Sequence, residues 1–72
     1  MIEMHKPKNA SSNITSLGYD EETGTMAVQF SKGGVYHYHG VDADTYTNLH
    51  SHGSPGSYLR TNVVGKFKHS KA

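Results

Sequence analysis

The segment Thr25 to Val41 alternates apolar and polar side chains before and after a pair of glycines, and this pattern limits the fold more than any other part of the chain. A period of two residues places every second side chain on one face of a β-strand. Lys32-Gly33-Gly34 lies at the centre of the segment, and glycine supplies the left-handed backbone that a tight turn requires. The segment therefore predicts an antiparallel β-hairpin with one buried face.

The length of the turn decides which side chains of the hairpin face the core. A three-residue turn places Phe30 opposite Tyr36. Val28 then lies opposite Tyr38, and both tyrosines face the core. A two-residue turn would instead bring His37 to the apolar face, where a polar ring would have no evident partner. We therefore expect the three-residue turn.

One further strand precedes the hairpin. Residues 13–19 are rich in side chains that favour strands, and Leu17 and Tyr19 share one face by the two-residue period. Residues 20–24 are polar and end in glycine, which is typical of a hairpin turn. The order of elements begins with three consecutive antiparallel strands.

Two short helices follow the hairpin. Tyr46 and Leu49 are three residues apart, which favours a helix of about two turns resting on the sheet. Asp42 can accept hydrogen bonds from the free amides at its start. Residues 50–57 have the composition of a loop, in which Ser54-Pro55 is typical of the start of a second helix. The inward-facing residues of that helix are Tyr58, Leu59 and Val63, and Gly65 ends it.

These elements predict the α+β class, with a three-stranded antiparallel β-meander followed by two short α-helices packed on one face. A chain of 72 residues makes one small domain that buries about 60% of its unfolded surface. It contains no cysteine, so packing must stabilise it. We expect a flexible arm at residues 1–11, a folded domain at residues 12–67, and a basic tail at residues 68–72 that frays.

Charge and hydropathy exclude several classes of protein. The formal net charge is only +1, which is low for a dedicated nucleic-acid binder. Five of the six acids lie between positions 20 and 44, so the carboxy-terminal part of the chain is basic. No apolar run is long enough for a signal peptide or a membrane helix. We expect a cytoplasmic protein without membrane contact.

Tyr36 and Tyr38 allow two interpretations. Aromatic rings on a sheet can stack on single-stranded bases, at roughly 1–3 kcal/mol per base. In so small a core, two tyrosines also contribute much of the apolar area, with their hydroxyls at the rim. We favour the core interpretation, which leaves binding to other residues.

His37 and His39 project to the same side of the third strand, opposite the tyrosines. His50 and His52 form a second pair, and the two pairs could hold a zinc ion if they converge. Exposed histidine is the simpler explanation. We therefore expect no metal and no other cofactor.

The cations of the carboxy-terminal part could form a rim that contacts phosphates, aided by Lys32 in the glycine turn. An ordinary solvated surface is the alternative. The RNA-binding candidates from all these patterns are Lys32, Tyr36, His37, Tyr38, His39, Arg60, Lys66 and Lys68.

Catalysis has little support in the sequence. There is no cysteine nucleophile, and no serine lies in a recognisable nucleophile motif. The carboxylates lie in a turn and at a helix start, where burial and a raised pKa are not expected. We predict that the protein is not an enzyme.

An ordered set of short motifs resembles the KTSC domain over residues 12 to about 67. The set is Ser12-Asn-Ile14, Gly18-Tyr-Asp20, Thr23-Gly-Thr-Met26, Val28-Gln-Phe30, Gly33-Gly-Val-Tyr-His-Tyr38, Val41, Tyr46, Leu49 and Ser54-Pro-Gly-Ser-Tyr58. The family usually has proline where this chain has Asp42.

The KTSC domain is named for the carboxy-terminal extension of some lysyl-tRNA synthetases, and it also occurs as a small free-standing protein in bacteria and phages. The resemblance implies the fold described above, and its association with synthetases suggests RNA binding. Two functions follow as expectations. The first is a non-catalytic RNA-binding module, and the alternative is a protein-interaction module, such as a phage-borne accessory or inhibitor that docks on a host protein.

Overall fold

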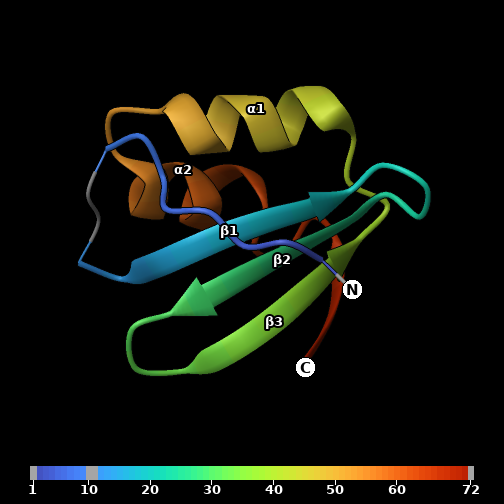
Figure 1. Ribbon diagram of the computed structural model, residues 1–72, viewed down its shortest axis with the longest axis horizontal. Helices are drawn as coiled ribbons and strands as arrows, with labels where there is room; N and C mark the ends of the chain where they lie inside the picture. Colours follow the sequence, from blue (N-terminus) through green and yellow to red (C-terminus); the bar gives the residue numbers. More distant parts are fainter. Residues whose placement is uncertain (1, 10–11, 72) are drawn as a thin grey trace.

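The computed structural model describes residues 2–9 and 12–71, and it contains a four-stranded antiparallel sheet and two helices (Figure 1). The elements are β1 (Ile14–Asp20), β2 (Thr25–Phe30), β3 (Gly34–His39), α1 (Ala43–Ser51), α2 (Pro55–Asn62) and β4 (Lys68–Lys71). The strands lie in the order β1-β2-β3-β4. The predicted α+β class and the meander followed by two helices are confirmed, with one more strand than expected.

The β2–β3 hairpin turns at residues 31–33, one residue earlier than predicted. Three of the five cross-strand pairs, those on the face of the tyrosines, are Met26–Tyr38, Val28–Tyr36 and Phe30–Gly34. The predicted partners of Tyr36 and Tyr38 are each wrong by two residues, because the left-handed glycine is Gly34 (φ 81°) at the start of β3. A shift of two keeps every side chain on its own face. Both tyrosines therefore face the core, as predicted.

The core lies between one face of the sheet and the two helices. Its buried members are Ile14, Leu17, Met26, Val28, Tyr38, Val41, Leu49, Leu59 and Val63. Leu49 brings α1 to this face and Leu59 brings α2, and neither side chain is more than 3% exposed. Helices this short are marginal in isolation, so their burial against the sheet is what stabilises them.

Both helices begin at the predicted residues, but no side chain caps either one. The Asp42 carboxylate accepts a hydrogen bond from the Thr45 hydroxyl instead of from a backbone amide. Ser54 makes no side-chain cap either. α1 extends into the predicted loop as far as Ser51, whose hydroxyl donates to the Thr47 carbonyl at 2.8 Å.

Residues 2–9 cross the sheet beside β1 (Figure 1), with Ile2 to Met4 against Gly18 and with Lys8 and Asn9 hydrogen-bonded to the carbonyls of His50 and His52 at the end of α1. His5 and Leu17 exchange two backbone hydrogen bonds, with N–O distances of 2.6 and 2.7 Å. Gly18 permits this approach, because a Cβ there would lie 2.5 Å from Ile2 Cγ2. The described part of the predicted flexible arm thus has specific backbone partners. Residues 1, 10 and 11 lie outside the described residues.

β4 is the element that the sequence did not predict. It pairs antiparallel with residues 36–39 of β3. All four of its residues are exposed, so its sequence has no burial pattern from which a strand could be recognised. The expectation that the tail frays is wrong for residues 68–71, because the β3 ladder holds them; Ala72 lies outside the described residues. No helix in the described chain could cross a membrane.

Candidate nucleic-acid interface

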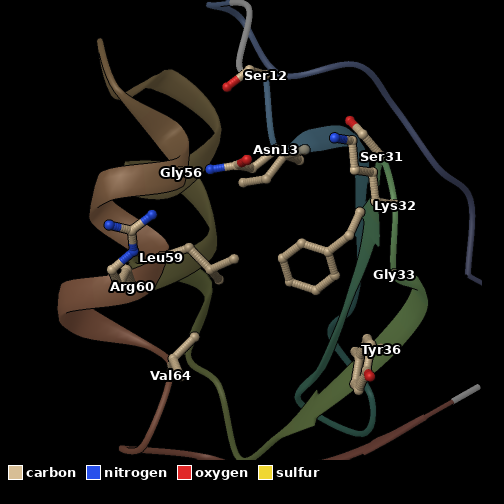
Figure 2. A pocket seen from close by; sticks show the side chains of 12 residues that line it. Ser12, Asn13, Ser31, Lys32, Gly33, Tyr36, Gly56, Leu59, Arg60 and Val64 are labelled. Atoms are coloured by element: carbon tan, nitrogen blue, oxygen red, sulfur yellow. The ribbon is translucent and has the colours of Figure 1, made fainter.

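A groove of about 750 Å³ opens between α2 and the turn that joins β2 to β3 (Figure 2). Side chains from β1, β2, β3 and α2 line it, so it depends on the whole fold rather than on one loop. Its apolar lining consists of Ile14, Phe30, Tyr36, Leu59 and Val64. This volume and this largely apolar lining are typical of a ligand site.

One wall of the groove comes from α2 and the residues after it. Gly56, Arg60 and Val64 recur every four residues and therefore lie on one side of the helix and its continuation. Gly56 has no side chain to fill the groove. Val64 is 48% exposed, and no other large apolar residue in the described chain is as exposed. A single exposed apolar residue is common on protein surfaces, so Val64 contributes here as part of the apolar groove lining and not by itself.

The opposite wall carries two aromatic rings. Phe30, at the end of β2, packs edge to face against Tyr36 of β3, with 5.6 Å between ring centroids and 78° between planes. Both side chains are half-buried and lie against the core. Because the core holds these rings, they present a preorganised aromatic surface to a flat ligand.

Two cations lie at the rim of the groove. Lys32 belongs to the β2–β3 turn and Arg60 to α2, and Figure 2 shows them on opposite sides. Both residues are exposed. The groove has no acidic residue among those that line it, so the two positive charges are not compensated locally. An anionic ligand with a flat apolar part complements such a site.

Three of the eight candidates from the sequence, Lys32, Tyr36 and Arg60, meet at this groove. Tyr38 does not, because it is 4% exposed in the core, where burial and then the neighbouring Tyr36 raise its pKa. Its placement confirms the core interpretation of this residue.

The histidine candidates lie on the other face of the sheet. His37 pairs with Ala27, and His39 pairs with Lys68 at the end of β3 farthest from the groove. A ring nitrogen of His39 lies 3.1 Å from the Ser70 hydroxyl. The remaining two of the five candidates outside the groove are exposed lysines: Lys66 lies in the segment between α2 and β4, and Lys68 is the first residue of β4. These positions make no common surface with Lys32 and Arg60.

The two histidine pairs do not form one cluster. The His50 ring lies beside Tyr46, with 5.9 Å between centroids, and the His52 ring lies 5.1 Å from Tyr58. Among residues 2–9 and 12–71, no three or more histidine, cysteine or acidic side chains are placed to hold a metal ion. The metal hypothesis for these histidines therefore has no geometric support.

The sequence assigned Phe30 and Leu59 to the core and not to a site, and it did not single out Val64. The four-residue spacing of Gly56, Arg60 and Val64 was a usable signal, although Val64 lies beyond the end of α2. The alternation of β2 predicted the inward face of Phe30, but it gave no sign that this ring lines a groove.

The family model for the KTSC domain matches residues 10–67. The chain belongs to the KTSC domain family. This KTSC domain also resembles a crystal structure of a KTSC domain protein from Yersinia pestis, with 30% sequence identity and a TM-score of 0.93. That comparison covers 100% of this chain and 99% of the other. No curated protein matches the chain.

The resemblance seen in the sequence is thereby confirmed. All the residues that line the groove, from Ser12 to Val64, fall within the matched part of the KTSC domain. β4 follows the matched part, so this strand lies outside what the family model describes.

Proposed function

We propose that this KTSC domain is a non-catalytic module that binds single-stranded RNA in the groove between α2 and the β2–β3 turn. One observation carries the proposal: an aromatic, apolar interior is combined with two uncompensated cations at its rim. Bases stack on aromatic side chains at about 1–3 kcal/mol per base, and lysine and arginine contact the phosphates.

The composition of the groove also supports a binding role rather than catalysis. The residues that line it include no cysteine, histidine or carboxylate, the side chains most used as nucleophiles and general acids or bases. The serines at its rim have no such base beside them among these residues. The site can therefore hold a ligand through stacking and charge, without a group that would transform it.

The direct test is a titration of fluorescently labelled single-stranded RNA hexamers at low salt and at increasing salt. We expect the logarithm of the binding constant to fall linearly with the logarithm of the salt concentration. The slope should be about −0.7 for each phosphate contacted. Arg60→Glu and Lys32→Glu should each weaken binding, because they place a negative charge at the rim. Absence of wild-type binding at low salt would remove the proposal.

Lys6→Glu is the matched control for these two variants. Lys6 is exposed and lines a different hollow, beside α1, so the same charge reversal occurs away from the groove. It should leave RNA affinity nearly unchanged. An equal loss in all three variants would show a non-specific charge effect instead of a groove.

A protein partner is the second candidate, and exposed Val64 is the observation that favours it. Apolar groove residues with a polar rim are also typical of protein interfaces. A single stoichiometric protein partner that survives nuclease treatment and is lost in Val64→Asp would replace the RNA proposal.

A further inference from the structure

A second hollow of about 320 Å³ continues the groove beyond Arg60. The two hollows share Ser12, Asn13, Gly56 and Arg60, so they form one continuous surface. The second hollow differs in chemistry, because its other lining residues are small, two of the four are serines, and none is aromatic. It suits a ribose and a phosphate, whereas the first hollow suits a base.

Arg60 is the one charged residue that lines the second hollow, and it lies where the two hollows join. Lys32 lies on the other side of the first hollow (Figure 2). The aromatic hollow therefore has one cation on each side. A nucleotide inside a strand carries two phosphates, one on the 5′ side and one on the 3′ side of its ribose, whereas a free mononucleotide carries a phosphate on one side only.

From this match we infer that the groove binds an internal nucleotide of an RNA strand, with the base in the aromatic hollow, one phosphate at Arg60 and the other at Lys32. The inference rests on the proposed function and specifies its ligand. The ribose and phosphate at Arg60 continue into the second hollow, so a strand passes through the site and does not end in it.

The test compares four probes by NMR titration of the isotope-labelled protein: uridine 5′-monophosphate, uridine 3′-monophosphate, uridine 3′,5′-bisphosphate and the uridine hexamer. The bisphosphate should bind about tenfold more tightly than either monophosphate, the size of one charge-assisted contact. The bisphosphate and the hexamer should change the NMR chemical shifts of residues in both hollows. Equal affinities of the bisphosphate and the monophosphates, with the hexamer still bound, would overturn the inference and leave the proposed function standing.

Arg60→Ala and Lys32→Ala identify the two phosphate contacts. Each variant should reduce the advantage of the bisphosphate to about that of a monophosphate, and each should lower the salt slope of hexamer binding by about 0.7. Lys6→Ala should change neither the advantage of the bisphosphate nor the salt slope of hexamer binding. Both groove residues are exposed, and the dispersion of the NMR spectrum verifies that each variant is folded.

Two further outcomes would contradict the inference. If only one of the two alanine variants lowers the salt slope, one phosphate is bound and the strand does not pass through. If the hexamer does not bind at all at low salt, the proposed function falls together with the inference.

Discussion

The ring of Tyr19 in β1 stacks on the ring of Tyr46 in α1, with 5.3 Å between their centroids and 13° between their planes. The Tyr19 hydroxyl also donates a hydrogen bond to the Val41 carbonyl at 2.6 Å. One side chain thus joins the first strand, the segment before α1 and α1 itself. Because α1 has no side-chain cap, these contacts contribute to its position on the sheet.

Tyr19→Phe should lower the free energy of unfolding by about 0.5–1.5 kcal/mol, because it keeps the stacked ring and removes one partly buried hydrogen bond. Chemical denaturation measures this change. Tyr58→Phe is the matched control, since the Tyr58 hydroxyl has no hydrogen-bond partner in the described part of the chain. Equal losses in the two variants would contradict the role of the Tyr19 hydroxyl.

Stability should fall in alkaline solution. Burial raises the pKa of Tyr19, Tyr38 and Tyr46 above the usual 10.0, and Asp42 is among the nearby charges that raise that of Tyr19 further. The unfolded chain therefore loses these protons first. The stabilisation is complete below about pH 10 and is lost as the pH rises through the raised values.

Urea unfolding midpoints measured between about pH 8 and pH 11 test this pH dependence. These three tyrosines should leave the unfolding midpoint nearly constant at the lower end of this pH range. The midpoint should fall toward the upper end, where the tyrosines of the unfolded chain lose their protons. Tyr38→Phe should show a shallower fall, because it removes one of the three groups whose pKa is raised. If the midpoint falls equally steeply in Tyr38→Phe, the ionisation of Tyr38 does not contribute to the loss of stability.

Gly18→Ala should displace residues 2–9 from the sheet. The new Cβ would lie 2.5 Å from the Glu3 carbonyl oxygen and from Ile2 Cγ2, and neither distance is possible without movement. We expect faster hydrogen exchange at the His5 and Leu17 amides. Gly53→Ala is the control, because a Cβ at Gly53 meets nothing within 4 Å. Unchanged exchange in Gly18→Ala would contradict this contact.

Removal of residues 68–72 should leave a folded domain that is less stable by about 1–3 kcal/mol, from the loss of four cross-strand pairs. The β3 edge would then be open, so self-association should increase at high concentration. Circular dichroism and light scattering measure the two effects. Replacement of Lys68 and Lys71 by serine, with the chain intact, separates the loss of charge from the loss of the strand.

The sequence predicted most of the fold because its periodic signals are local. The alternation of apolar and polar residues predicted β2, and the three-residue spacing of Tyr46 and Leu49 predicted α1. Both predictions place the element within a residue or two of its position in the structure. The hairpin register was less accessible. No apolar side chain among residues 31–34 fixes the position of the turn, and its displacement by one residue, from 32–34 to 31–33, moves each cross-strand pair by two residues.

The groove and the edge elements could not be predicted because they depend on contacts between distant segments. β4 has no buried residue, and residues 2–9 are held mainly by backbone hydrogen bonds, which leave no periodic side-chain pattern. Lys32 and Arg60 were identified as cations with no indication that they share one groove. Their positions on the two sides of one groove follow from the packing of α2 beside the β2–β3 turn.

The two ends of the described chain lie on the two outer strands of the sheet, residues 2–9 beside β1 and Lys68–Lys71 as β4. A purification tag or a fusion partner at either end therefore begins at a sheet edge. A flexible glycine-serine spacer before it allows the pairing with Leu17 or with β3 to persist. A rigid helical spacer that begins directly after Lys71 would instead pull on a strand held by a single neighbour.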